Sequence, residues 1–114
     1  MAQERLSAAQ GARAGGFPSS ATSLAYYAML YAARAALSEE DRYAKTHSGV
    51  WNLFGSSFVE SGRFDRGLFD ESRKVQRARE AADYDAAAVS AAQASSVVAL
   101  AERFVTSVRQ LVGE

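Results

Sequence analysis

One stretch of the chain, from about Ala21 to Leu37, is apolar or aromatic at nearly every position. Only Thr22, Ser23 and Arg34 interrupt it, so no side of a helix formed here is polar enough to face water. A helix that is apolar all round is buried, and we expect this one at the centre of the fold. Amphipathic neighbours from one short chain would hardly cover it on every side, so we expect a second subunit to cover part of it.

The residues before this stretch are divided by glycine and proline. The Ala-rich segment from about Gln3 to Ala14 predicts a short helix, which the glycines at positions 15 and 16 would end. Pro18 suits the first turn of the central helix, with Ser19 or Ser20 as its cap.

After the central helix, the residues at 42–46 predict a polar connection. A third helix is expected from Thr46 or His47 to Gly62, because apolar residues recur there at the spacing of a core face. The positions are Val50, Leu53, Phe54, Ser57 and Phe58, of which Ser57 alone is polar.

Two further helices are predicted towards the C-terminus. Asp65 or a neighbour can cap a helix that runs to about Ala82, with a turn at 83–85. The last helix begins with Ser90 and Gln93, whose spacing matches a capping box. Its apolar stripe comprises Val97, Leu100, Ala101, Phe104, Val108 and Leu111.

Together these segments predict an all-α fold with no strands. We expect an antiparallel up-and-down bundle of four main helices plus a short N-terminal helix, because short connections place successive helices side by side. The 114 residues suit a single domain, which we assign to residues 1–114.

Composition and charge exclude several classes of protein. The chain has no cysteine and one histidine, so a disulfide framework and a thiolate metal site are excluded, and we expect no metal and no cofactor. Basic and acidic residues number 13 each, which gives no general attraction to nucleic acid or membranes. With no signal peptide at residues 1–13 and no run of roughly 18 apolar residues, we expect a cytoplasmic protein without membrane contact.

Arg79 is the first candidate for chemistry. It lies in helical register with Leu68, Ser72 and Val75, on the side predicted to be buried. A guanidinium does not lose its charge on burial, so it needs a carboxylate, a phosphate or several carbonyls. Asp83 and Tyr84 follow within about one turn of helix. A structural ion pair between Arg79 and Asp83 is the alternative to a ligand site.

His47 is the second candidate, because histidine is the side chain that titrates near neutrality when unperturbed. Lys45 stands close by, and the alternative is a polar residue at a helix start. Tyr26 and Tyr27 are adjacent and therefore project about 100° apart on a helix, so one ring can pack while the other turns its hydroxyl towards a cleft. Packing in the core is again the alternative.

A local excess of positive charge occurs between residues 63 and 79. Six basic residues stand there against three acidic ones. Such a run can hold a phosphate backbone, but it is also common on solvated helices, so its nucleic-acid signal is weak.

Three motifs resemble one family. They are Ser-Leu-Ala-Tyr-Tyr-Ala-Met at 23–29, Lys-Thr-His-Ser-Gly-Val at 45–50 and Arg-Glu-Ala-Ala-Asp-Tyr at 79–84. In this order they resemble a prokaryotic branch of the HEPN-domain proteins, over roughly residues 17–112. The resemblance implies a helical bundle that forms a homodimer and is often paired with a minimal nucleotidyltransferase in a toxin–antitoxin-like system.

Many relatives in that family are metal-independent ribonucleases with an Arg, four to six residues and then a His. The resemblance implies that the His acts on the 2′-hydroxyl or the leaving group and the Arg stabilises phosphate charge. Here Arg79 is followed at the matching place by Tyr84, and a tyrosine with a pKa of about 10 is a poor general base. A literal match from Arg42 to His47 straddles a connection, and we treat it as a coincidence.

Three functions are therefore open. The first is a nucleotide- or RNA-binding module that contacts phosphate through Arg79 and Lys45, with Asp83, Tyr26 and Tyr27 lining the site. The second is a ribonuclease toxin that uses Arg79 with His47 or Tyr84. The third is a non-catalytic helical scaffold.

Overall fold

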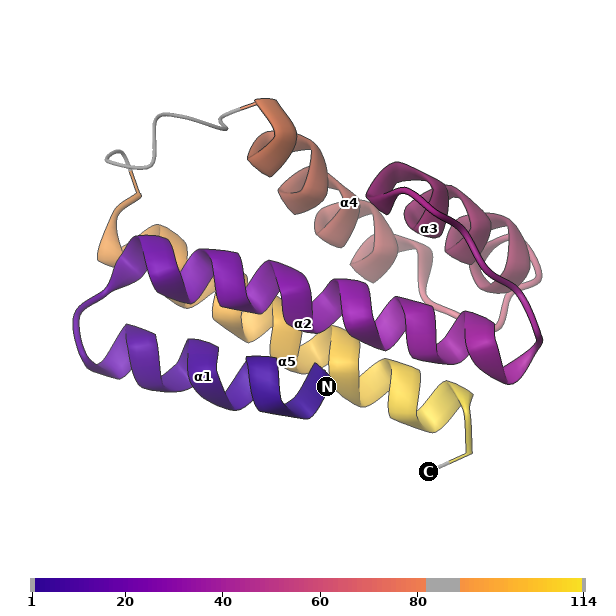
Figure 1. Ribbon diagram of the computed structural model, residues 1–114, viewed down its shortest axis with the longest axis horizontal. Helices are drawn as coiled ribbons and strands as arrows, with labels where there is room; N and C mark the ends of the chain where they lie inside the picture. The colour runs from indigo at the N-terminus through magenta and orange to yellow at the C-terminus, as the bar shows by residue number, and fades with distance from the viewer. Residues whose placement is uncertain (1, 82–88, 114) are drawn as a thin grey trace.

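The computed structural model describes residues 2–81 and 89–113, and within these ranges every regular element is a helix (Figure 1). In chain order the elements are α1 (Ala2–Ala14), α2 (Pro18–Glu39), α3 (His47–Phe54), the π-helical turn η1 (Gly55–Val59), α4 (Arg66–Ala81) and α5 (Ala91–Leu111). The all-α helical bundle predicted from the sequence is confirmed.

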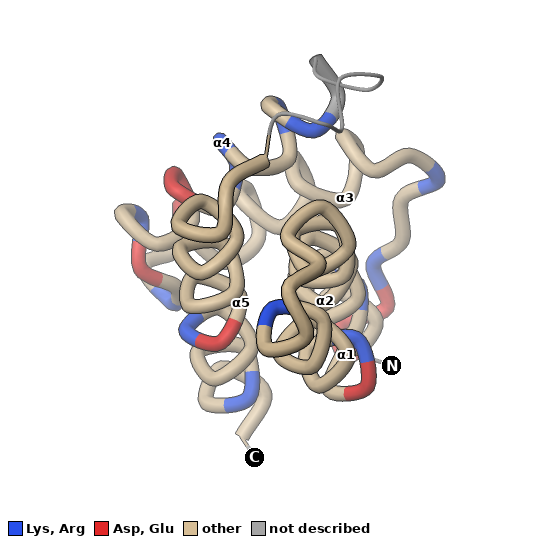
Figure 2. Tube along the Cα trace, turned by 90° about the vertical axis from the view of Figure 1, so that its left-hand side faces the viewer, with Lys and Arg blue, Asp and Glu red and all other residues tan. Residues whose placement is uncertain are grey.

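Helix α2 lies at the centre and packs against α1 and α5 (Figure 1). Between residues 21 and 37 only Ala35 is exposed. Arg34 is the one charged residue in this stretch, and Figure 2 shows most charged residues on the other elements. A single chain therefore buries most of α2, while Leu24, Tyr27 and Tyr31 stay partly exposed; the second subunit suggested by the sequence remains a prediction.

The predicted antiparallel arrangement of neighbouring helices holds for some pairs but not for all. Helix α1 is antiparallel to α2, and α4 is antiparallel to α5 (Figure 1). Helix α3 instead runs in the same direction as α2, because the connection at 40–46 returns along the molecule before α3 begins (Figure 1). Residues 40–42 form a turn bonded back to the end of α2, and residues 43–46 cover the remaining distance to the start of α3.

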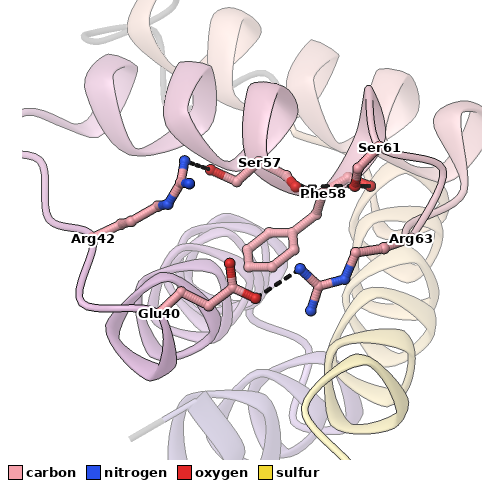
Figure 3. Close-up of polar contacts among 6 residues, drawn as sticks. All are labelled: Glu40, Arg42, Ser57, Phe58, Ser61 and Arg63. Atoms are coloured by element: carbon pink, nitrogen blue, oxygen red, sulfur yellow. Dashed lines mark hydrogen bonds and ion pairs between the residues drawn. The ribbon is translucent and has the colours of Figure 1, made fainter.

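Polar contacts hold η1 against the start of this connection (Figure 3). Arg63 Nη1 donates to Glu40 Oε2 at 2.6 Å, and its guanidinium lies over the Phe58 ring at 4.9 Å from the centroid. Arg42 Nη1 donates to Ser57 Oγ at 2.9 Å. The side chains of the ion pair are 46% and 32% exposed, so the pair contributes at most about 1 kcal/mol to stability.

Two of the predicted helix caps are confirmed. Asp65 Oδ2 accepts from the Leu68 backbone N–H at 2.8 Å, at the start of α4. Ser90 and Gln93 form a complete capping box at the start of α5.

The predicted cap of α2 was wrong. Pro18 occupies the first helical position and Phe17 is the N-cap, without a side-chain hydrogen bond. Proline favours this position because it lacks an N–H and its φ is already helical. Ser19 and Ser20 consequently lie inside the helix rather than before it.

Aromatic rings join α3, η1, α4 and α5. Phe54 is fully buried, and its ring centroid lies 4.9–6.1 Å from those of four other phenylalanines. These are Phe58, Phe64, Phe69 and Phe104. Gly55 permits this packing, because a Cβ there would lie 3.0 Å from Phe69 Cζ.

Replacing Phe54 by alanine should lower the free energy of unfolding by about 3–5 kcal/mol, because it removes the ring at the centre of this cluster and leaves a cavity. Urea denaturation followed by the fluorescence of Trp51, the single tryptophan, measures the change. Phe17→Ala is the control, since that ring is 63% exposed and its loss should cost less than about 0.5 kcal/mol. Equal effects of the two substitutions would contradict this account of the core.

Candidate functional site

Four of the residues singled out in the sequence meet where the start of α3 and the end of α4 approach the first half of α2. They are Tyr26 and Tyr27 from α2, His47 from α3 and Arg79 from α4. We call these four residues the tyrosine–arginine cluster.

Arg79 rests on both tyrosine rings. Its guanidinium carbon lies 5.3 Å from the centroid of Tyr26 and 5.1 Å from that of Tyr27. The two rings meet edge to face, with centroids 5.4 Å apart and planes at 70°. Tyr26 and Tyr27 can both contact Arg79 because consecutive residues of a helix project about 100° apart and can flank one side chain.

No described residue forms an ion pair with Arg79. Cation–π contacts are worth about 0.5–2 kcal/mol, depending on how far the cation is desolvated. They hold the cation without a carboxylate, so the N–H groups of the guanidinium are not committed to an anionic acceptor of the described chain.

His47 contacts the same two rings. A hydrogen bond of 3.2 Å joins Tyr26 Oη and His47 Nδ1, and the tautomer of the imidazole decides which atom donates. The imidazole centroid lies 5.9 Å from each tyrosine centroid. Thr46 fixes the start of α3, because its side chain accepts from the Gly49 backbone N–H at 2.9 Å.

The four residues differ in their access to solvent. Tyr26 is 1% exposed, so it lies at the back of the cluster. Tyr27, His47 and Arg79 are only partly buried. A ligand approaching the cluster would therefore meet these three residues, with Tyr26 supporting them from behind.

Other residues considered in the sequence lie elsewhere. Lys45 is exposed, in the connection that precedes α3, and forms no ion pair with a described residue. Arg42 is bonded to Ser57 of η1 (Figure 3), so the literal Arg-to-His spacing does not bring its guanidinium to His47. Asp83 and Tyr84 lie outside the described residues.

Comparison with known proteins identifies the family. The model of the HEPN domain matches residues 1–111. The chain belongs to the HEPN family. The resemblance carried by the three sequence motifs is thereby confirmed at the level of the family.

Three proteins are similar in sequence to this HEPN chain over most of its length. Two proteins of Methanocaldococcus jannaschii, each named "Putative toxin", are 33% identical over 75% of the chain and 31% identical over all of it. A UPF0332 protein of Gloeobacter violaceus is 34% identical over 70% of the chain. The chain spans 58%, 85% and 64% of the lengths of these three relatives, respectively. No solved structure is significantly similar to it.

Two further observations concern the described part of the HEPN chain. In residues 2–81 and 89–113, no three side chains among histidine, cysteine, aspartate and glutamate gather as they would around a metal ion. None of the helices in these ranges has the length and apolarity needed to cross a bilayer.

Four basic residues of the run at 63–79 line a groove on the other side of α4; the sequence indicated the charge but not the groove. It has a volume of about 510 Å³ and lies between α3 with η1 and α4. We call it the basic groove, because its lining includes Arg66, Arg73, Lys74 and Arg77. The helical spacing of Arg66, Arg73 and Arg77, with Asp70 in the same row, is the signal that could have revealed it.

Replacing Tyr26 by phenylalanine should remove the hydrogen bond to His47 while the ring that supports Arg79 stays in place. We expect a loss of about 1 kcal/mol in the free energy of unfolding and a shift of the imidazole signals in NMR spectra. His47 is the one histidine of the chain, so these signals are unambiguous. Tyr43→Phe is the control, because Tyr43 is 72% exposed. Imidazole signals unchanged by Tyr26→Phe would contradict the contact.

Proposed function

We propose that this HEPN chain is a nucleotide- or RNA-binding toxin module in which Arg79 binds phosphate. The observation that carries the proposal is the support of the Arg79 guanidinium by two tyrosine rings with no acidic partner among the described residues. An arginine held in this way, with no acidic partner in residues 2–81 and 89–113, is positioned to bind an external anion.

Within this site the residues have different roles. Arg79 donates hydrogen bonds to phosphate oxygens, which are worth about 1.5–3 kcal/mol each to a charged group. Tyr26 is a positioning residue, because it is buried behind the cluster. Tyr27 is partly exposed and so lies within reach of the ligand. Lys45 and Asp83 remain candidates for secondary contacts.

The toxin assignment draws on the relatives, two of which carry that name. The pairing with a minimal nucleotidyltransferase and the homodimer are proposed from the HEPN resemblance. Part of α2, including Leu24, Tyr27 and Tyr31, is still partly exposed and could contribute to such a dimer.

Arg79→Ala should weaken binding of a labelled single-stranded RNA by about 10-fold or more, measured by fluorescence anisotropy, because at least one charge-assisted contact is lost. Arg79→Lys should bind with intermediate affinity, since a lysine keeps the charge but not the planar donor geometry. Arg13→Ala removes an exposed charge on α1 and should change the affinity by less than about twofold. If Arg79→Ala binds as well as wild type, the proposed site is wrong.

A second candidate function, a metal-independent ribonuclease, is favoured by the position of His47. The imidazole contacts the same two tyrosines as Arg79, although it comes from another helix. In this reaction His47 would take the proton of the 2′-hydroxyl or give one to the leaving oxygen, while Arg79 stabilises the charge on the phosphate.

This candidate predicts cleavage of single-stranded RNA in the presence of EDTA. His47→Ala should reduce the rate by about 100-fold or more, the usual contribution of a general acid or base. Tyr84→Phe tests which residue acts as the general acid or base with Arg79. If His47 has this role, the cleavage rate of Tyr84→Phe should equal that of wild type. An RNA-binding protein that cleaves nothing under these conditions would exclude the ribonuclease and leave the binding module in place.

A further inference from the structure

The basic groove follows the line along which α3 and η1 pack against α4. Its α4 wall carries Arg66, Arg73, Lys74 and Arg77, and its opposite wall includes Asn52 and Ser56. Arg73 Nη2 donates to Asn52 Oδ1 at 2.8 Å, which ties the two walls together.

The groove has a net positive charge. Asp70 and Glu60 are its two acidic lining residues, against four basic ones. Arg66, Lys74 and Arg77 are exposed and form no ion pair with a described residue. Their charges are therefore available to a ligand, in a chain whose overall charge is zero.

The basic side chains of the groove form a row along the helix. Arg73 and Arg77 are four residues apart and so lie one above the other on α4, with Lys74 beside them. A row of cations separated by helical turns matches a polymer with repeating negative charges better than it matches a single anion.

The row also leads towards the tyrosine–arginine cluster. Arg77 is the last basic residue of the groove, and Arg79 follows two positions later on the side of α4 that faces α2. Figure 2 shows basic residues recurring along α4. The basic groove and Arg79 therefore lie on two sides of the same stretch of α4.

We propose that the basic groove binds the phosphate backbone of single-stranded RNA and extends the binding site beyond the tyrosine–arginine cluster. This inference rests on the proposed function, because it takes RNA as the ligand of Arg79. It adds a dependence on length: a short oligonucleotide fills the cluster alone, whereas a longer one also occupies the groove.

The test compares single-stranded RNA oligomers of about 4 and about 15 nucleotides, lengths that bracket typical single-strand sites. In the double variant Lys74→Glu with Arg77→Glu, the longer oligomer should bind about 10-fold more weakly and with a smaller salt dependence, since two phosphate contacts are lost. The shorter oligomer should bind within about twofold of wild type. Arg79→Ala should weaken both, and circular dichroism verifies that every variant is folded.

The matched control is Arg13→Glu with Arg103→Glu, which changes the net charge equally on α1 and α5. Equal weakening of the longer oligomer by both double variants would overturn the inference, because net charge alone would then explain it. A groove variant that binds both oligomers like wild type, while Arg79→Ala binds neither well, would also overturn it and would leave the proposed function standing. If the wild-type protein binds neither oligomer, the proposed function and the groove fall together.

Discussion

The apolar surface of α2 has to be removed from water, and the positions of the other helices follow from how the chain achieves this. Burying apolar surface contributes about 25 cal/mol per Å², so a helix that is apolar on all sides dominates the energetics. α1 and α5 pack against it, and α3 is brought back beside its first half. The same return places His47 against Tyr26. The geometry of the cluster is thus a by-product of covering the central helix.

The support of Arg79 by aromatic rings has chemical consequences that an ion pair would not have. A carboxylate would neutralise the guanidinium and occupy its donors, whereas a ring face attracts the cation through its quadrupole and leaves the net charge in place. The rings also limit the freedom of a long side chain, which reduces the entropy lost when a ligand is bound. Adjacent tyrosines on one helix, Tyr26 and Tyr27, provide both effects.

Much of the fold could be predicted from the sequence, because helical periodicity and caps such as Ser90 with Gln93 are local signals. The register of Arg79 with Leu68 indicated the side of α4 that faces α2, although Arg79 is only partly buried there. Its contacts with the tyrosines could not be predicted, since they depend on the path of the connection at 40–46, and short connections favour antiparallel neighbours. The π-helical turn at Gly55–Val59 was also missed, because the spacing of apolar residues does not distinguish it from a continuing α-helix.

The connection at 40–46 also sets how far the start of α3 can lie from the end of α2. Its first three residues form a turn bonded back to α2, so only residues 43–46 span the rest of the way to α3. Added residues would give slack at a small cost in entropy, whereas each removed residue would shorten the reach by more than 3 Å. Tolerance of length changes here is therefore one-sided: longer connections keep His47 within reach of Tyr26, and shorter ones pull it away.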